Sequence, residues 1–233
     1  MNSVLVIPTY NEKDNIQALV EEILNILPEI NILIVDDNSP DGTGSIAERL
    51  HQRYEQVRVL HRKRKEGLGK AYIAGFMEAL KINPDYIMQM DADFSHSPEY
   101  IQLFLKEIAQ YDLVLGSRFL DKEKQPLNVA LLSVWSSWFT KHMLGLQVND
   151  CLGGFKCFRK TLIEKIRLDK FISKGFIFQA EFVYRAIRQG ARIKEIPIVF
   201  YPRKSGKTKK SNKIFFEAFF KILIMRIFRL WII

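Results

Sequence analysis

Cysteine is scarce in this chain, which has only Cys151 and Cys157 among its 233 residues. Two cysteines at this spacing provide neither a disulfide framework nor a zinc-binding pattern. We therefore expect free thiols in a reducing compartment. The sequence also lacks a basic amino-terminal region with a cleavage site, and it lacks an uncharged apolar run of about 18 residues. These absences predict no signal peptide and no conventional transmembrane helix.

Acidic residues are fewer than basic ones, 26 against 35, and the formal net charge is +9. Such a balance points to an anionic partner, which is a nucleic acid, an anionic lipid or a phosphorylated substrate. Nucleic-acid binding would require a contiguous basic patch with stacking aromatics. The strongest basic run, residues 203–213, instead adjoins an apolar segment, so we expect no nucleic-acid partner.

Short apolar runs alternate with helical patterns through the first half of the chain. We predict strands at 4–7, 30–35, 57–61, 86–90 and 113–116, with helices at 14–27, 43–54, 67–81 and 98–110 between them. The second half is less regular and is expected to hold helices at 127–145, 160–168 and 178–189 and a strand at 193–201. This alternation predicts an α/β fold with a mainly parallel central sheet and helices on both faces.

The carboxyl-terminal segment combines a basic run with an apolar helix. Residues 203–213 contain six lysines and arginines and no acid. In a helix over 214–233, large apolar residues would share one face about 140° wide. These residues are Phe215, Phe216, Phe219, Phe220, Leu223, Ile227 and Leu230. A basic amphipathic helix is typical of membrane-surface binding, and the alternative is a helix packed on the domain or on a partner.

Two carboxylates, separated by one residue, follow the predicted strand at 86–90. Asp91 and Asp93 thus leave the sheet at the carboxyl ends of its strands, where open α/β sheets bind ligands. Two close carboxylates repel each other unless a cation lies between them or one is protonated. Mg²⁺ takes one or two carboxylates and completes its shell with substrate phosphates. We therefore predict a Mg²⁺ or Mn²⁺ site for a diphosphate, with solvated loop carboxylates as the alternative.

Two further polar clusters follow the first and second predicted strands on the same edge of the sheet. Pro8, Tyr10 and Glu12 could hold a base and a ribose. Asp36 and Asp37 could accept hydrogen bonds from a base edge or a ribose hydroxyl, as acids do in dinucleotide-binding folds. Each cluster alone is compatible with a turn or a helix cap. Acidic clusters at three strand ends on one edge favour a nucleotide site.

Together these segments resemble the inverting family-2 glycosyltransferases, which have the GT-A fold, and among them the polyprenyl-phosphate sugar transferases typified by dolichol-phosphate mannose synthases. The matching segments, in the family's order, are 8–12, 36–43, 67–72, 91–99, 116–118, 154–156, 175–181 and 203–209. The resemblance implies a catalytic domain over 1–202, with a nucleotide-sugar half (1–125) and an acceptor half (126–202). A basic segment and a membrane-surface helix would follow at 203–233.

The resemblance also implies roles for individual residues. The nucleotide would be held by Pro8, Tyr10, Glu12, Val35 and Asp37. The metal and diphosphate site would be formed by Asp91, Ala92 and Asp93, with Ser95 where the family often has Gln. Phosphates would also be contacted by Arg118, Arg203 and Lys209. The sugar pocket would be lined by Gln179 and Glu181. The catalytic residues would be Asp91, Asp93 and Arg118.

The acceptor end departs from the family pattern. Members usually carry an arginine shortly after Gly-Ser-Arg that binds the acceptor phosphate, and residues 119–140 contain none. The nearby candidates are Ser136, Lys122 and Lys124. A second possibility is therefore a saccharide or protein hydroxyl as acceptor. Such an acceptor would need a general base, for which Asp150 and Glu181 are the first candidates.

By this resemblance the chain is expected to move a hexose, with mannose favoured, from a nucleoside-diphosphate sugar to a dolichyl or undecaprenyl phosphate. GDP-mannose is the favoured donor and UDP-glucose its rival. The enzyme would be cytoplasmic, peripheral on the cytoplasmic face of a membrane, and bound there alone or through a small membrane protein partner. A phosphate monoester is largely dianionic at neutral pH, so it could attack the anomeric carbon without a base.

A catalytically silent membrane subunit is the non-enzyme alternative, and the intact pair of Asp91 and Asp93 disfavours it. The four histidines, at positions 51, 61, 96 and 142, show no ligand spacing and are predicted to be surface or loop residues.

Overall fold

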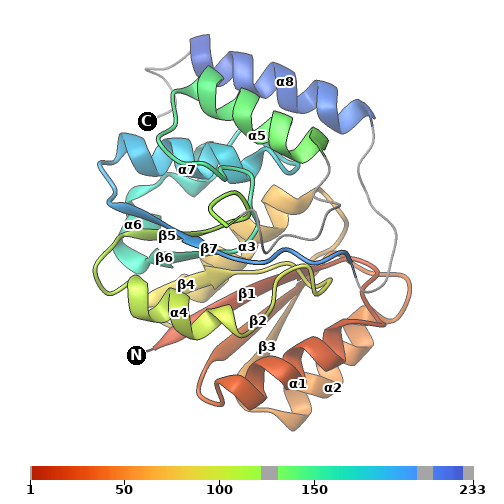
Figure 1. The fold of residues 1–233 in the computed structure, drawn as a ribbon. Coiled ribbons are helices and arrows are strands. Elements are labelled where there is room, and N and C mark those ends of the chain that lie inside the picture. Colours follow the sequence, from red (N-terminus) through yellow and green to blue (C-terminus); the bar gives the residue numbers. More distant parts are fainter. Residues whose placement is uncertain (1, 122–130, 204–211, 228–233) are drawn as a thin grey trace.

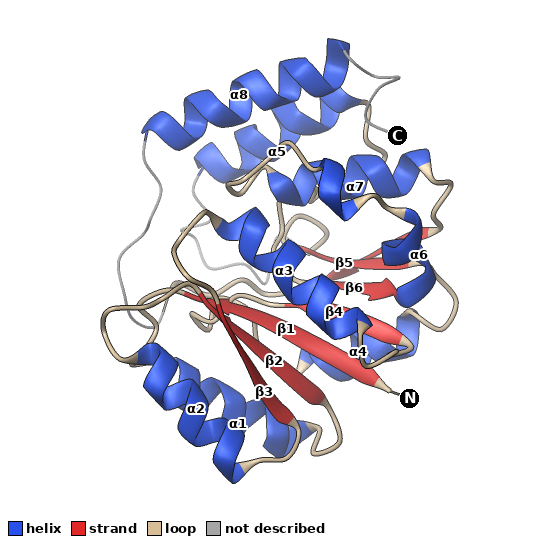
Figure 2. Ribbon diagram, turned by 180° about the vertical axis from the view of Figure 1, so that it is seen from behind, coloured by secondary structure: helices blue, strands red, loops and turns tan. Residues whose placement is uncertain are grey.

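The computed structural model describes residues 2–121, 131–203 and 212–227. Among these residues a seven-stranded sheet has the order β3-β2-β1-β4-β6-β5-β7 (Figures 1 and 2). The strands are β1 (Ser3–Thr9), β2 (Asn31–Asp36), β3 (Val57–His61), β4 (Tyr86–Gln89), β5 (Leu113–Ser117), β6 (Lys156–Arg159) and β7 (Ile193–Pro197). The helices are α1 (Ile16–Ile26), α2 (Thr43–Arg53), α3 (Leu68–Leu80), α4 (Tyr100–Glu107), α5 (Leu131–Leu144), α6 (Lys160–Lys165), α7 (Phe178–Arg188) and α8 (Asn212–Ile227).

Neighbouring strands run parallel except at β6, which pairs antiparallel with both β4 and β5. The predicted α/β fold with a mainly parallel sheet is thus confirmed. The sequence analysis missed β6, because this strand has only four residues and carries Lys156 and Arg159, which break any apolar run. The strand predicted at 193–201 ends early, at Pro197, and beyond it Phe200 makes only an isolated bridge to His96.

Alternate residues of the central strands face two separate cores, because successive side chains of a strand point to opposite sides. On β1, Leu5 and Ile7 belong to a core shared with α1, α2 and α4. Val4 and Val6 belong to the opposite core, which is shared with α3, α6 and α7. Helices α5 and α8 lie beyond α7 as an outer layer on this side (Figure 1). Helices therefore cover both faces, as predicted.

Close packing fixes α3 against both the sheet and α7. A Cβ added at Gly75 would overlap the side chain of Val6 on β1, so the glycine allows the helix to approach the strand. At the start of α3, a Cβ at Gly69 would lie 2.8 Å from the Cβ of Phe178 on α7. Tyr72 stacks on Phe178, with ring centroids 6.1 Å apart. The beginnings of α3 and α7 are thereby held together beside the ends of the strands.

Helix α8 packs on α5 through a face that the sequence pattern did not predict. The residues buried in this contact region are Ala218, Ile222 and Met225. Phe219, Phe220 and Ile227, from the predicted apolar face, are 46%, 60% and 72% exposed. Over residues 218–227 the helix therefore carries apolar side chains both on its packed face and on the predicted apolar face. It packs on the domain and still presents an apolar face outward. No described helix has both the length and the apolarity needed to cross a membrane.

Candidate active site

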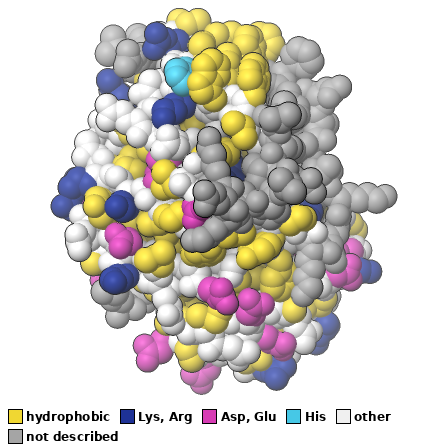
Figure 3. Space-filling view, viewed as in Figure 1, with side chains coloured by type: hydrophobic (Ala, Val, Ile, Leu, Met, Phe, Trp, Pro, Cys, Tyr) yellow, Lys and Arg dark blue, Asp and Glu magenta, His cyan; other side chains and the backbone are white. Residues whose placement is uncertain are grey.

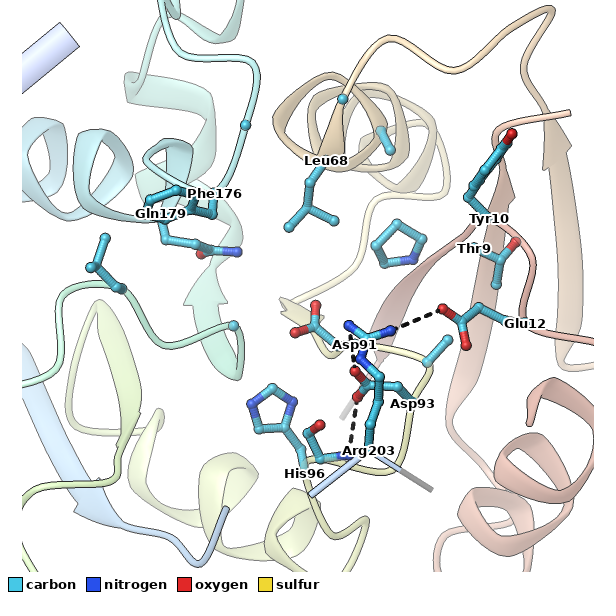
Figure 4. A pocket seen from close by; sticks show the side chains of 18 of the residues that line it. Thr9, Tyr10, Glu12, Leu68, Asp91, Asp93, His96, Phe176, Gln179 and Arg203 are labelled. Carbon is cyan, nitrogen blue, oxygen red and sulfur yellow. Dashed lines mark hydrogen bonds and ion pairs between the residues drawn. The ribbon is translucent and has the colours of Figure 1, made fainter. Parts of the chain in front are cut away.

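A cavity of about 490 Å³ opens at the carboxyl ends of the parallel strands (Figure 4). Its size is within the range of about 300–1,000 Å³ common for small-molecule sites. Eleven of the predicted site residues line it, coming from segments far apart in the sequence. These are Pro8, Tyr10, Glu12, Asp37, Asp91, Ala92, Asp93, Arg118, Ser136, Gln179 and Arg203. The fold therefore brings the donor and acceptor candidates into one cavity.

The two carboxylates after β4 lie in the centre of this cavity wall. Asp91 Oδ1 accepts a hydrogen bond from the Tyr72 hydroxyl at 2.9 Å. Burial raises the pKa of Tyr72 well above its usual range, and the Asp91 charge raises it further, so the phenol remains a donor. A Cβ at Gly154 would lie 2.7 Å from Asp91 Oδ2, so any other residue here would require the carboxylate to shift. Asp93 Oδ1 accepts from the backbone N–H of Ser95 at 3.0 Å.

Arg203 bridges the Asp93 carboxylate to the nucleotide side of the cavity. Its guanidinium lies 2.9 Å from Asp93 Oδ2 and 3.6 Å from Glu12 Oε1 (Figure 4). The arginine thus occupies, on Asp93, a position where a metal cation would also be attracted.

The donor set fits a divalent cation that shares its shell with a substrate. Within the described residues, no group of three or more histidine, cysteine or acidic side chains could hold a metal. Asp91 and Asp93 supply two carboxylates, and Mg²⁺ is commonly bound in this way, with phosphate oxygens and water completing the shell. The geometry suits a cation that arrives with a diphosphate better than one held by the protein alone.

The far end of the cavity, beyond Glu12, has an aromatic and acidic lining. Lys65 Nζ lies 3.9 Å from the centroid of the Tyr10 ring. Asp37 forms an ion pair with Arg62. Burial raises the pKa of Asp37, and the Arg62 charge opposes that shift. An aromatic face beside a carboxylate is a suitable environment for a base and a ribose.

Arg118 follows β5 and is anchored from beneath by Asp150. The carboxylate accepts from Arg118 Nε and one terminal nitrogen, each at 2.7 Å, and from its backbone N–H at 3.0 Å. Burial alone would raise the pKa of Asp150, but the Arg118 guanidinium holds it below its usual value. The Asp150 side chain is fully buried, whereas that of Arg118 is 12% exposed and lines the cavity. Arg118 therefore presents a fixed positive charge to a ligand.

Three of the residues to which the family resemblance assigns a donor or sugar role are not among those lining the cavity. Val35 is buried within β2, and its Cγ2 lies 3.0 Å from the position that a Cβ on Gly75 would take. Glu181 is fully buried in α7, where its carboxylate accepts from the backbone of Ile172 and Ser173 and from Arg185. It organises the loop before α7 instead of lining a sugar pocket. Lys209 lies outside the described residues.

All four histidines lie on the surface or in a loop, as predicted, but the burial of one of them was not predicted. His96 is only 2% exposed and lines the cavity, whereas the other three histidines are exposed, as predicted. Its ring lies between Phe155 and Phe200, at centroid distances of 5.3 and 5.4 Å. Burial lowers its pKa, although Asp91 and Asp93 oppose the shift. Its place three residues after Asp93, in the same loop, was a signal that could have identified it.

An apolar groove continues from the cavity between α5 and α8. Its volume is about 360 Å³, and it shares Ser136 and Phe176 with the 490 Å³ cavity, which is called the catalytic cavity below. Its remaining lining is mostly apolar and includes Phe139, Phe219 and Ile222. Figure 3 shows hydrophobic side chains gathered over the same two helices. The exposed members of this apolar face are Val134, Trp135, Trp138, Phe219, Phe220, Ile224 and Ile227.

Residues 4–167 match the sequence model of the family described as Glycosyl transferase family 2. The chain is 37% identical over 225 residues to a polyprenol monophosphomannose synthase of Mycolicibacterium smegmatis, covering 94% of this chain and 85% of that protein. It is 39% identical over 221 residues to an undecaprenyl-phosphate mannosyltransferase of Micrococcus luteus, covering 94% and 91%.

A solved structure of glucosyl-3-phosphoglycerate synthase from Mycobacterium tuberculosis, in complex with Mn²⁺, UDP-glucose and phosphoglyceric acid, superimposes with a TM-score of 0.74. The likeness covers 97% of this chain and 79% of that one at 14% identity. At this identity the likeness establishes the fold, which is the GT-A fold.

Proposed function

Since the chain belongs to glycosyl transferase family 2, we propose that it transfers a hexose, with mannose favoured, from a nucleoside-diphosphate sugar to a polyprenyl phosphate at a membrane surface. The observation that carries this proposal is the continuity of two cavities. A polar cavity holding Asp91, Asp93 and Arg118 shares Ser136 and Phe176 with an apolar groove. A phosphate attached to an isoprenoid chain matches this change from charged to apolar lining.

The donor would extend from Tyr10 and Asp37 to the carboxylate pair. GDP-mannose is the favoured donor, because two relatives with 37% and 39% identity are named as mannose-transferring enzymes. Asp91 and Asp93 would hold Mg²⁺ or Mn²⁺ together with the diphosphate. Bound there, the cation would neutralise charge that develops on the leaving nucleoside diphosphate. Arg203 would leave Asp93 to the cation and bind the phosphates. Lys209, which lies outside the described residues, would also bind the phosphates.

The acceptor would place its phosphate at Arg118 and its chain toward the groove. Arg118 supplies a charged donor, which is the strong kind of hydrogen bond for a phosphate. A largely dianionic phosphate needs no general base to attack the sugar. Asp150 and Glu181, the candidate bases for a hydroxyl acceptor, are both engaged by arginines and absent from the cavity lining. These contacts support the phosphate acceptor over a saccharide or protein hydroxyl.

The apolar face of α5 and α8 would rest on the membrane. It lies around the apolar groove, so an acceptor lipid could enter from the bilayer. We propose a peripheral location on the cytoplasmic face, with catalysis in residues 1–202 and membrane contact through 203–233 together with α5. Because the chain itself offers this exposed apolar face, the proposal does not require a membrane protein partner.

The test is a transfer assay with radiolabelled nucleotide sugars, Mn²⁺ or Mg²⁺, and a short polyprenyl phosphate. Labelled lipid formed by the wild type, and not by Asp93→Ala, is the expected result, and the active donor identifies the sugar. Donor hydrolysis without labelled lipid would contradict the proposal and favour a hydroxyl acceptor.

A further inference from the structure

Gln179, in the first turn of α7, has an amide nitrogen without a hydrogen-bond partner among the described residues. The side chain is 2% exposed and lines the catalytic cavity. In Figure 4 its amide nitrogen points into that cavity. A buried N–H without a partner is costly, and such groups are normally satisfied by protein, water or ligand. The buried Gln179 amide nitrogen therefore still has a hydrogen to donate to a ligand atom that accepts a hydrogen bond.

The orientation of this amide is determined from behind by two other side chains. Gln179 Oε1 accepts from Gln89 Nε2 at 2.6 Å and also from Lys156 Nζ. If the amide were reversed, its NH₂ group would face two donors, and the lysine nitrogen at least cannot become an acceptor while it is charged. The oxygen is thus directed away from the cavity and the nitrogen toward it.

The two supporting side chains are themselves fixed by backbone carbonyls of one turn. Gln89 Nε2 donates to Gly154 O at 2.9 Å, and Lys156 Nζ donates to Gly153 O. Burial lowers the pKa of Lys156 to about 7, although the Asp150 charge opposes this. A neutral amine still carries two protons, so Lys156 can donate to both Gly153 O and Gln179 Oε1 after deprotonation. The same hydrogen bonds can therefore still form when Lys156 is neutral.

The position of Gln179 within the cavity indicates which part of a substrate it would meet. Gln179 lies on the opposite side from Tyr10 and Glu12, with Asp91 and Asp93 between them (Figure 4). A donor with its nucleotide at Tyr10 and its diphosphate at the carboxylates would place its sugar toward Gln179. A neutral amide suits a hydroxyl oxygen, whereas phosphates are more often bound by charged donors.

We propose that Gln179 donates a hydrogen bond to a ring hydroxyl of the transferred sugar, and that Gln89 and Lys156 are positioning residues that fix it as a donor. The proposal rests on the proposed function only in taking the donor to be a nucleotide sugar. It assigns to Gln179 a part in sugar selectivity, and to Lys156, which does not line the cavity, an action through Gln179 alone.

The test compares donor binding by calorimetry with nucleotide sugars that each lack one sugar hydroxyl. Wild type should bind one of these deoxy donors about 10-fold more weakly than the complete donor. Gln179→Glu keeps an oxygen for Gln89 and Lys156 but removes the N–H, and Gln179→Met removes it without adding charge. Both variants should bind that deoxy donor and the complete donor equally, and should bind the nucleoside diphosphate alone as the wild type does.

The positioning residues are tested by the same measurement, which is the ratio of the affinity for the complete donor to the affinity for the deoxy donor. Gln89→Glu places an acceptor against Gln179 Oε1, and Lys156→Met removes the second donor, so either change should reduce the discrimination. The matched control is Gln102→Glu, because Gln102 is exposed and donates only to Ile26 O at 3.2 Å. A merely structural role would lower the unfolding temperature and leave the ratio of affinities unchanged.

Two results would overturn the proposal. One is full discrimination against every deoxy donor in the Gln179 variants. The other is unchanged discrimination with a raised KM for polyprenyl phosphate, which would assign Gln179 to the acceptor. Labelled lipid made by the wild type tests the proposed function separately. Its absence would refute the polyprenyl acceptor, while the binding comparison would still give an answer for Gln179.

Discussion

Arg118 and Asp150 form a two-pronged ion pair beneath the catalytic cavity, with both N–O distances at 2.7 Å. Asp150 is fully buried and Arg118 reaches the cavity. The buried carboxylate therefore holds the Arg118 guanidinium in one orientation toward the substrate. The backbone N–H groups of Asn149 and Asp150 are held in turn by the Glu195 carboxylate, at 2.8 to 2.9 Å.

Replacing Asp150 by Asn should weaken both the fold and acceptor binding. Breaking a buried ion pair by removing one charge typically costs about 3–5 kcal/mol of unfolding free energy. Arg118 would also lose its fixed orientation, so the KM for the acceptor phosphate should rise. The measurements are urea unfolding and acceptor titration of Asp150→Asn. The control is Asp112→Asn, whose partners Arg192 and Arg159 are 65% and 29% exposed and for which a loss below about 1 kcal/mol is expected. Equal losses in the two variants would contradict this account.

Asp93→Asn should reduce kcat/KM by about 10²- to 10³-fold, the usual effect of removing one group that stabilises developing charge. The reason is that Asp93 is one of the two carboxylates after β4 that would hold the cation. Steady-state kinetics at several Mn²⁺ concentrations will check it, with the exposed Asp85→Asn as control. An unchanged dependence on Mn²⁺ would remove Asp93 from the metal site.

Stability should rise with pH above neutrality because of Lys156. Burial lowers its pKa in the folded protein to about 7, whereas in the unfolded chain it stays near about 10.4. Between these values the unfolded chain binds more protons, so stability increases by up to about 1.4 kcal/mol per pH unit. Below about pH 7 this contribution is constant, because both states are protonated.

The measurement is urea unfolding from pH 7 to pH 9, compared between wild type and Lys156→Met. The variant should lack the rise that Lys156 contributes. Lys81→Met, at an exposed position, should keep it. If the unfolding free energy rises equally with pH in all three proteins, then Lys156 has the same pKa in the folded and unfolded chains.

The exposed apolar face of α5 and α8 should bind lipid vesicles. Phe220 and Ile227 are 60% and 72% exposed, and burying a large apolar side chain is worth about 1.5–3 kcal/mol. Changing both to Glu should therefore lower the vesicle partition coefficient by about 10-fold or more. Vesicle sedimentation will measure it, and Met77→Glu, at an exposed apolar position on α3, is the control. Equal binding by the control and the double variant would place the membrane contact elsewhere.

The sequence predicted the sheet well because β1, β2, β4 and β5 are buried on both faces and are therefore nearly continuous apolar runs. The same rule failed at β6, where Lys156 is buried by hydrogen bonds that no sequence pattern reveals. Helix α8 was placed correctly, but its packing face was not, because a helix with apolar side chains on two faces has no unique packing face.

The candidate site was predicted best where strand ends supply its residues. Asp91, Asp93 and Arg118 follow strands whose ends meet at one edge, so their convergence follows from the fold. The positions of Glu181 and His96 could not be predicted, because they depend on tertiary contacts of loops. The Glu181 carboxylate accepts from the backbone of the loop before α7, and the His96 ring turns inward from its loop onto Phe155.

The outward apolar face of α5 and α8 has a kinetic consequence. An enzyme seated on a bilayer by these side chains meets its lipid by diffusion within a plane instead of from solution. Its rate then follows the mole fraction of acceptor in the surface, so inert phospholipid acts as a diluent even when the total acceptor concentration is constant. Removing that face would turn a two-dimensional encounter into a three-dimensional one.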